Sequence, residues 1–414
     1  MTVRPSDILE ASKKLENVVR KTPTELNANL SARYKANIYL KREDLQVVRS
    51  YKIRGAYNAI ASCTPEELQK GIVCASAGNH AQGVALTCQL LDIKGHIFMP
   101  TTTPQQKIKQ VKMFGKKNVE VILTGDTFDD AYKKSVEYCN ANGNMFIPPF
   151  DNPKVISGQG TVGLEIIEAI KKPIDYLFIP VGGGGLVSGV SIYFDALSPT
   201  TKIIGVEPLG APAMKISLEK NEIVTLESID KFVDGAAVKR VGNLNFEICK
   251  EHIDDIVLVP EGKVCTTILQ LYGEEAIVVE PAGALSIAAL DFYKDQIVGK
   301  NVVCIVSGSN NDIDRMQEIK ERSLVYENLK HYFIITFPQR AGALREFLTK
   351  VLGENDDITF FEYTKKTNKE YGSAAVGIEL QDQNDYEALV ERMKAYNFPF
   401  TTINDNPSLF SYLI

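Results

Sequence analysis

The sequence predicts an α/β protein in which a large parallel-sheet domain is followed by a small ferredoxin-like domain. Three observations support this. Apolar, β-branched runs alternate with helical segments over roughly the first 310 residues, a charged stretch follows, and the remaining residues repeat strand and helix signals in the order βαββαβ. The chain has 414 residues, of which 44% are hydrophobic and 24% charged. This composition is typical of globular proteins with a large buried core and more than one domain.

The apolar runs of the first part are continuous rather than alternating with polar residues. Strands of this kind lie buried on both faces, as in parallel sheets covered by crossover helices. Each run is short and is followed by a turn signal or by a segment with helical periodicity. The runs read GIVCASA, GHIFMP, VEVILTG, DYLFIPV, TKIIGVEP and NVVCIVSGS.

The composition becomes charged between Asp312 and Lys330, which predicts a connecting helix and a domain boundary near residue 320. We therefore expect a catalytic domain over 1–320 and a second domain over 321–414. The second domain has the βαββαβ order of the ferredoxin-like fold. Its predicted elements are strand HYFIITFP, helix GALREFLTKVL, strand DITFFEYTKK, strand SAAVGIELQ, helix DYEALVERMKAYN and strand PFTTIN.

Charge and cysteine usage exclude several classes of protein. The net charge is −6 and the two signs are mixed along the chain, so no basic face for nucleic acid is expected. The seven cysteines lack a C-x-x-C pair and the four histidines are scattered, which argues for a reducing compartment and against a zinc site. The N-terminal segment has no apolar signal core, and Pro180 and four glycines interrupt the uncharged run 176–194. We expect a cytoplasmic protein without a membrane partner.

The first candidate motif is Ser50-Tyr51-Lys52-Ile53-Arg54-Gly55-Ala56, which opens a helical stretch for which Ser50 is a plausible N-cap. A lysine in the first helical turn lies in the positive field of the helix end. This field disfavours the ammonium form and helps to supply the neutral amine that a Schiff base requires. Taken alone, the motif also describes an ordinary solvated lysine.

Two further motifs lie between a buried strand and a helix. Ser76-Ala77-Gly78-Asn79-His80 presents backbone N–H groups at a helix N-terminus, which suits a carboxylate or phosphate, although an ordinary tight turn has the same pattern. Gly182-Gly183-Gly184-Gly185-Leu186 indicates a phosphate cradle, because ordering four glycines costs much conformational entropy. It matches neither a P-loop nor G-x-G-x-x-G. Glu207 ends the next strand, where a ribose-binding acid would stand, so NAD binding stays open.

The last motif, Ser307-Gly308-Ser309-Asn310, places a hydroxyl at the carboxyl end of a buried strand, where open α/β sheets bind ligands. The same residues are also typical of a plain turn. Glu280, in VVEPAGA, is either a carboxylate of the site or a residue that begins a helix.

Together and in this order, SYKIRGA, SAGNHAQGVA, VGGGGLVSG, VEPAGA and SGSN resemble the fold-type II (tryptophan synthase β-like) pyridoxal-phosphate enzymes. Among these, the threonine deaminases of the biosynthetic short form are the most similar, because the C-terminal domain resembles their single ACT-like regulatory domain. The resemblance spans nearly the whole chain. It implies conversion of L-threonine to 2-oxobutanoate and ammonia, the first step of isoleucine biosynthesis.

The resemblance also implies a role for each motif. Lys52 binds the cofactor covalently and then acts as the base at the substrate Cα. Tyr51, where many members have phenylalanine, packs near the cofactor, and Asn79 contacts its 3-hydroxyl. Ser307 faces the pyridine nitrogen, where a neutral hydroxyl makes the ring a weaker electron sink than an aspartate would and favours elimination over transamination. The remaining assignments are Gly182, Gly183, Gly184, Gly185 and Leu186 to the cofactor phosphate, Glu280 to the cofactor, and Ser76, Ala77, Gly78, Asn79 and His80 to the substrate carboxylate.

The resemblance of the C-terminal domain implies isoleucine as an inhibitor and valine as its antagonist, and kinship with the family implies a homotetramer. Family members often bind a cation near the strand that ends in Glu207, but the loop EPLGAPAM lacks the aspartate of some relatives, so no metal is assigned. On the same scaffold, a serine or hydroxyaspartate dehydratase or a serine racemase is the alternative, because one methyl group changes binding by only about 1–3 kcal/mol. Two other classes stay open: an amino-acid sensor built on a degenerate enzyme, and the NAD oxidoreductase.

Overall fold

The computed structural model describes residues 3–363 and 370–404 and divides the chain into two compact units, Met1–Asp312 and Ile313–Ile414. The boundary expected near residue 320 falls inside helix α14 (Met316–Tyr326). This helix packs within the second unit, because the Glu321 carboxylate accepts hydrogen bonds from Lys330 Nζ and Tyr332 Oη, both at 2.6 Å. The connecting helix therefore belongs to the second unit.

The first unit contains a six-stranded sheet in the order β1-β2-β10-β7-β8-β9. β1 pairs antiparallel with β2, and the other neighbours are parallel, as the continuous apolar runs predict. β10 comes last in the sequence but lies in the middle of the sheet. The strands are β1 (Thr24–Leu26), β2 (Asn37–Arg42), β7 (Tyr176–Pro180), β8 (Lys202–Pro208), β9 (Asp255–Val259) and β10 (Asn301–Val306).

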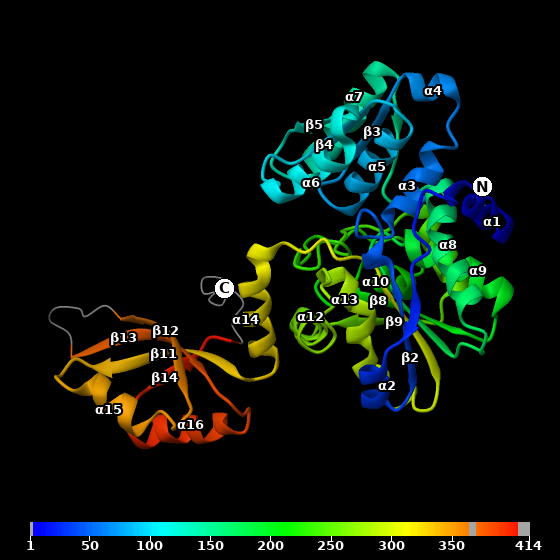
Figure 1. The fold of residues 1–414 in the computed structure, drawn as a ribbon. Helices are drawn as coiled ribbons and strands as arrows, with labels where there is room; N and C mark the ends of the chain where they lie inside the picture. Colours follow the sequence, from blue (N-terminus) through cyan, green and yellow to red (C-terminus); the bar gives the residue numbers. More distant parts are fainter. Residues whose placement is uncertain (1–2, 364–369, 405–414) are drawn as a thin grey trace. The chain divides into compact units, whose positions relative to one another are not determined.

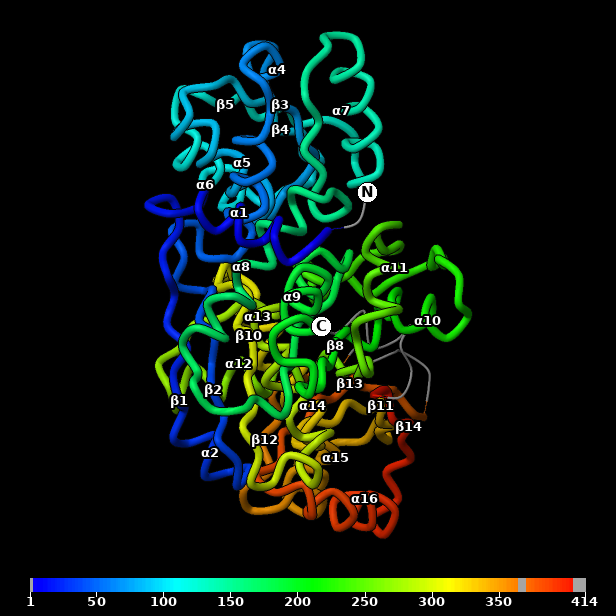
Figure 2. Tube along the Cα trace, turned by 90° about the vertical axis from the view of Figure 1, so that its right-hand side faces the viewer, coloured from blue at the N-terminus to red at the C-terminus, as the bar shows by residue number. Residues whose placement is uncertain are grey.

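A second, four-stranded parallel sheet in the order β5-β4-β3-β6 forms a separate layer of the same unit. With its helices it lies at one end of the unit, coloured from blue through cyan to blue-green in both views (Figures 1 and 2). Its strands are β3 (Ile72–Ala75), β4 (Gly95–Met99), β5 (Val119–Leu123) and β6 (Met145–Phe146), and its helices are α4 (Pro65–Gln69), α5 (Asn79–Leu90), α6 (Gln105–Gly115) and α7 (Phe128–Asn142).

Helices α3 (Lys52–Ile60), α8 (Pro153–Ala169) and α9 (Gly185–Leu197) pack with their backbones in close contact. A Cβ at Gly158 would lie 2.5 Å from the Arg54 carbonyl oxygen, so this approach requires glycine. The other helices of the unit are α1 (Pro5–Leu15), α2 (Ala28–Tyr34), α10 (Ala213–Lys220), α11 (Asn243–His252), α12 (Glu261–Glu275) and α13 (Pro281–Ala288), with 3₁₀ turns η1 (Glu43–Leu45), η2 (Lys116–Asn118) and η3 (Ala289–Tyr293).

The prediction that Ser50 caps α3 is wrong. Tyr51 holds the N-cap position, and no side chain makes a capping hydrogen bond there. Instead, Ser50 forms an isolated antiparallel bridge with Gly308, so the chain enters the helix one residue later than the residue types suggest. This bridge ties the start of α3 to the end of β10.

The second unit has the ferredoxin-like βαββαβ fold that the sequence predicts. Its antiparallel sheet has the order β12-β13-β11-β14, and Phe333, Phe337 and Phe347 are among its buried core residues. The predicted strand 357–366 is described only as far as Tyr363, because residues 364–366 lie outside the described ranges. The elements after α14, with the 3₁₀ turn η4 (Ile313–Arg315) before it, are β11 (Lys330–Pro338), α15 (Ala343–Lys350), β12 (Asp357–Tyr363), β13 (Tyr371–Glu379), α16 (Asp385–Ala395) and β14 (Phe400–Thr402).

Candidate active site

Hydrogen bonds join four of the five sequence motifs, and the fifth, the glycine turn, contacts Phe150, which follows the Pro149 carbonyl that accepts from Lys52 Nζ. The Tyr51 N–H donates to the Ser307 carbonyl at 3.2 Å, which joins the start of α3 to the end of β10. Asn79 Nδ2 donates to Glu280 Oε1 at 2.6 Å, which joins the four-stranded sheet to α13. The Glu280 N–H in turn donates to the Gly308 carbonyl at 3.2 Å. Residues far apart in the sequence therefore form one site.

Lys52 is the first residue of α3, and its amine lies inside this site. Its Nζ donates to the Pro149 carbonyl at 3.0 Å and lies 5.4 Å from the centroid of the Tyr51 ring. Burial lowers the pKa of Lys52 to about 8, although the negative charge of Glu280 acts to raise it. Burial, rather than the helix end considered from the sequence, is the main cause of this shift. The amine thus becomes neutral far more readily than a solvated lysine.

The glycine turn after β7 has a geometry that side chains would block. Gly184 has φ of +95°, and a Cβ at Gly183 would lie 2.2 Å from the Phe150 ring. The N–H groups of Gly185 and Leu186, in the first turn of α9, have no acceptor within the helix. Asn245 Nδ2 holds the turn through the Gly183 carbonyl at 2.9 Å. A turn of this kind accommodates a phosphate against the main chain.

A chain of hydrogen bonds orients Asn79. Asn310 Nδ2 donates to Asn79 Oδ1 at 2.6 Å, and Asn79 Nδ2 donates to the Glu280 carboxylate. Burial and then Asp234 raise the pKa of Glu280 to about 7, while the hydrogen bond from Asn79 and the charge of Lys107 lower it. Glu280 also holds the N-cap position of α13. It is therefore both a helix-start residue and a buried carboxylate of the site.

The loop Ser76–His80 leads into α5, whose first residue is Asn79. The Gly78 N–H donates to Ser76 Oγ at 3.2 Å, and a Cβ at Gly78 would meet nothing within 4 Å. The His80 ring contacts the Ile147 carbonyl through Nε2 at 2.9 Å. Burial, and next the Lys52 charge, lower the pKa of His80 to about 3, so its imidazole is neutral. The Ser76 N–H donates to the Phe98 carbonyl, so the N–H groups of Ala77, Asn79 and His80, rather than this imidazole, are left for a carboxylate.

Ser307 directly follows β10, and Glu207 is the last residue but one of β8, both in the six-stranded sheet. The buried Ser307 Oγ donates to the Ala282 carbonyl at 3.2 Å. The fully buried Glu207 carboxylate accepts from the N–H groups of Met214 and Lys215, both at 2.8 Å, and so caps α10. Among the residues described, no group of three or more His, Cys, Asp or Glu side chains is arranged to hold a metal ion.

The sequence did not point to several residues that shape the site. Phe150 covers the glycine turn, Asn245 fixes it, and Lys107 forms an ion pair with Asp234, Nζ to Oδ2 2.5 Å, close enough to Glu280 for both charges to affect its pKa. None of these residues stands in a recognisable motif. Each reaches the site only through the fold of the chain. Asn310, which binds the Asn79 side chain, is a further residue of the site, and it does lie in a motif, SGSN.

The site fits pyridoxal phosphate by the chemistry of its groups. A readily neutralised amine at Lys52 suits an aldehyde, and a turn that admits only glycine suits a phosphate. An oriented amide at Asn79 and a neutral hydroxyl at Ser307 supply two further hydrogen-bonding groups.

Comparisons with known proteins agree with this fit. Residues 15–308 match the family described as pyridoxal-phosphate dependent enzyme, and residues 321–413 match the C-terminal regulatory domain of threonine dehydratase. The L-threonine dehydratase biosynthetic IlvA of Halalkalibacterium halodurans is 61% identical over 412 residues, which cover 100% of this chain and 99% of that protein.

Solved structures with the same fold include the processed form of threonine deaminase isoform 2 from Solanum lycopersicum. It is 45% identical, has a TM-score of 0.74 and covers 77% of this chain and 92% of its own. Maize serine racemase is 30% identical and has a TM-score of 0.73, and the match covers 79% of this chain and 99% of the racemase. The chain therefore belongs to the family of pyridoxal-phosphate-dependent threonine dehydratases, with their C-terminal regulatory domain.

Proposed function

We propose that this enzyme converts L-threonine to 2-oxobutanoate and ammonia, the first step of isoleucine biosynthesis. The observation that carries the proposal is the buried Lys52 amine, whose pKa lies near 8 and which donates to the Pro149 carbonyl, next to the Phe150 ring that covers a turn only glycine can form. The relative at 61% identity over the full chain is a biosynthetic L-threonine dehydratase, which supports threonine as the substrate.

Each group of the site has one task in this reaction. Pyridoxal phosphate supplies an aldehyde that links to amines and a conjugated ring that accepts electrons from the substrate Cα. Lys52 would hold the cofactor and, as a free amine, would remove the proton from Cα. The N–H groups from Gly182 to Leu186 would bind the phosphate, Asn79 would orient the ring, and the loop Ser76–His80 would bind the substrate carboxylate. Glu280 and Tyr51 would border the cofactor.

The products follow from the bonds that break. Loss of the Cα proton and the β-hydroxyl removes one water molecule and leaves an enamine, whose hydrolysis gives the keto acid and ammonia. Ser307 favours this outcome, because a neutral hydroxyl does not stabilise a protonated pyridine nitrogen as a carboxylate would. The electron pair that the proton leaves at Cα would then form the Cα=Cβ double bond, and the β-hydroxyl would depart with the electrons of the Cβ–O bond and a proton, as water.

The direct test is covalent trapping. Borohydride should reduce the link to the cofactor, abolish the visible absorbance and leave the label on Lys52. Lys52→Ala should lose both the label and ammonia release from threonine, whereas Lys13→Ala, at an exposed position on α1, should keep both. A Lys52→Ala variant that releases ammonia at the wild-type rate contradicts the proposal.

Serine is the alternative substrate, because the maize serine racemase shares the fold at 30% identity. Rates of keto-acid formation from L-threonine and L-serine, together with a chiral assay for D-serine, separate a threonine dehydratase from a serine dehydratase or a racemase. The proposal requires a higher kcat/KM for threonine and no accumulation of D-serine.

We also propose that the second unit binds isoleucine as an inhibitor and valine as its antagonist. A pocket of about 500 Å³ lies at the turn between β11 and α15. Phe337, Phe361 and Tyr363 offer an apolar surface for a branched side chain, and Arg340 and Arg345 offer cations for a carboxylate. Calorimetry on the full chain should detect isoleucine binding that Arg345→Gln weakens. Unchanged threonine turnover at millimolar isoleucine contradicts this regulation.

A homotetramer in the cytoplasm completes the proposal. All seven cysteines are free, and six of them are buried, which suits a reducing compartment. Among residues 3–363 and 370–404, no helix combines the length and apolar character that a membrane span needs. Sedimentation equilibrium of the full chain tests the assembly.

A further inference from the structure

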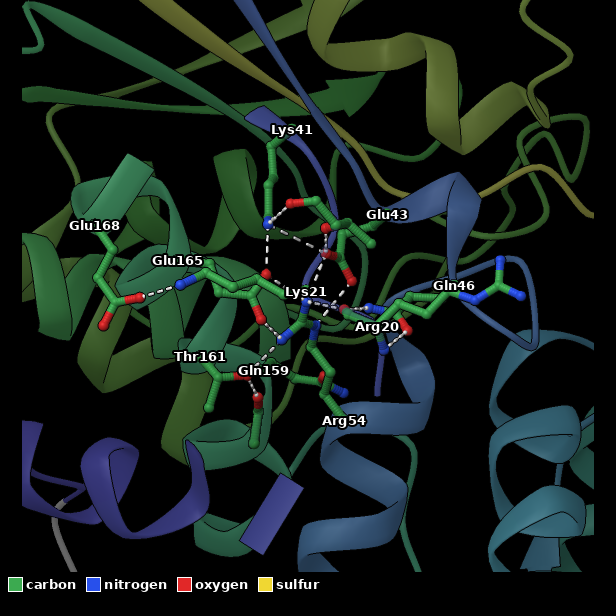
Figure 3. A network of polar contacts seen from close by, with 12 residues as sticks. Arg20, Lys21, Lys41, Glu43, Gln46, Arg54, Gln159, Thr161, Glu165 and Glu168 are labelled. Carbon is green, nitrogen blue, oxygen red and sulfur yellow. Dashed lines mark hydrogen bonds and ion pairs between the residues drawn. The ribbon is translucent and has the colours of Figure 1, made fainter. Parts of the chain in front are cut away.

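Four charged side chains are buried together beside the start of α3. Lys41 lies in β2, Glu43 begins η1, Arg54 lies in α3 and Glu165 lies in α8, and the four converge in Figure 3. The side chains of Lys41, Glu43 and Arg54 are fully buried, and that of Glu165 is 11% exposed. Two positive and two negative groups balance, so the network, named here the α3 anchor, carries no net charge.

Arg54 is the centre of the α3 anchor. It binds the Glu43 carboxylate with Nε and Nη2, both at 2.8 Å, and the Glu165 carboxylate with Nη1 at 2.7 Å and Nη2 at 2.9 Å. Nη1 also donates to Thr161 Oγ1 at 3.1 Å. Lys41 Nζ binds Glu165 Oε2 at 2.5 Å and the Thr22 carbonyl at 2.8 Å. The planar guanidinium is thus held from two sides, a geometry that only arginine provides.

Stability alone does not account for this arrangement. Buried ion pairs lose most of their attraction to desolvation, and apolar residues of similar size often stabilise a core equally well. Such pairs add geometric specificity, because two forked hydrogen-bonded contacts fix both the position and the rotation of the helix that carries them. That helix begins with Lys52, two residues before Arg54.

Helices α3 and α8 also form the surroundings of the Lys52 amine. The Gly55 N–H donates to Gln159 Oε1 at 3.1 Å, and Asn58 Nδ2 donates to the Lys154 carbonyl at 2.7 Å, so α3 is bound to α8 along its length. Just before α8, the chain supplies the Pro149 carbonyl that accepts from Lys52 Nζ. A shift of α3 against α8 would therefore move the amine relative to its acceptor.

We infer that Arg54 is a positioning residue for Lys52, which, through its paired contacts with Glu43 and Glu165, fixes the place from which the amine reaches the cofactor aldehyde. The inference rests on the proposed role of Lys52. The action is mechanical: the α3 anchor holds the helix that carries Lys52, whereas burial lowers the pKa of Lys52 and Glu280 opposes this shift.

The experiment compares a graded series of variants with a matched control. Thr161→Val removes one contact of Arg54, Glu165→Gln weakens two, Glu165→Ala removes both, and Arg54→Lys keeps the charge but loses the fork. Glu168→Gln is the control, because Glu168 lies one turn further along α8 and pairs with Lys21, Nζ to Oε2 2.6 Å, at side-chain exposures of 51% and 68%. Figure 3 shows the pair of Glu168 with Lys21 and the pair of Glu165 with Arg54.

Two measurements are made on folded protein, with circular dichroism confirming the fold of each variant. The first is the rate at which cofactor-free protein captures pyridoxal phosphate at Lys52, followed by absorbance and borohydride trapping. The second is kcat and KM for threonine. A misplacement of about 1 Å slows reactions at a site by on the order of a hundredfold. We expect capture and kcat to fall in the order of the series, with KM nearly unchanged and the pH midpoint of capture unmoved.

The outcomes separate the inference from the proposed function. Folded Glu165→Ala that captures the cofactor at the wild-type rate overturns the inference, as does a moved pH midpoint, which would indicate an electrostatic action. If Arg54→Lys does not fold, Thr161→Val and Glu165→Gln decide the matter, because each leaves the guanidinium in place. Failure of the wild-type protein to capture pyridoxal phosphate at Lys52 would instead refute the proposed function.

Discussion

Lys52 should react with the cofactor over a pH range set by its burial. A solvated lysine has a pKa near 10.5, and burial brings that of Lys52 to about 8. At pH 7 the neutral fraction is then roughly 300-fold larger than for a solvated lysine. The rate of cofactor capture, which requires the neutral amine, should rise with pH and level off above a midpoint near 8.

Replacing Glu280 with glutamine should change this profile in one direction. The ionised carboxylate raises the pKa of Lys52. The variant should therefore show a lower midpoint and faster capture between about pH 7 and 8. Below pH 7 the two profiles should converge, because the pKa of Glu280 is itself about 7 and the wild-type carboxyl is then protonated and uncharged as well.

The assay is rapid mixing of cofactor-free protein with excess pyridoxal phosphate at a series of pH values, followed by absorbance. Borohydride trapping and mass spectrometry confirm that Lys52 carries the label. A wild-type midpoint near 10.5, or a midpoint that rises in Glu280→Gln, would refute the account of this amine.

Three further substitutions test other parts of the structure. Gly183→Ala would place a Cβ 2.2 Å from the Phe150 ring. Overpacking of about 1–3 kcal/mol should weaken cofactor binding by roughly 5- to 150-fold, with partial rescue by Phe150→Leu in a binding titration. Ser307→Asp should lower threonine turnover and increase transamination, detected as pyridoxamine phosphate; full turnover would count against the role of the neutral hydroxyl. Lys35→Gly, at an exposed helix end with φ of 51°, should raise the free energy of unfolding in urea by about 1 kcal/mol, whereas Lys35→Ala should not.

The parts of the site that are continuous in sequence were predictable, because their chemistry is local. A glycine run between a buried strand and a helix has few uses other than holding an anion, and Lys52 and Asn79 stand in motifs of the same family. The roles of these residues stay predictions until the experiments above are done. The parallel sheets and the ferredoxin-like domain followed from the continuous apolar runs and from the βαββαβ order.

Features that depend on tertiary contacts were not predictable. The capping role expected of Ser50 was wrong, because a bridge to Gly308 holds its backbone, and residue types near Ser50 carry no sign of that distant partner. Arg54 and Glu165 are 111 residues apart, and each alone reads as a surface charge. Phe150 covers the glycine turn only because the loop before α8 folds over it.

The position of β10 bears on how the protein is made. Asn301 and Asn37, which lie opposite each other on β10 and β2, are 264 residues apart in the sequence. During synthesis the ribosome must therefore release nearly all of the first unit before its central strand can join the sheet, and until then β2 and β7 lack the neighbour that separates them. Unpaired strands of this kind are prone to aggregation. Slow, late closure of the sheet should make this unit the part of the nascent chain that most needs chaperones, whereas the small second unit emerges afterwards.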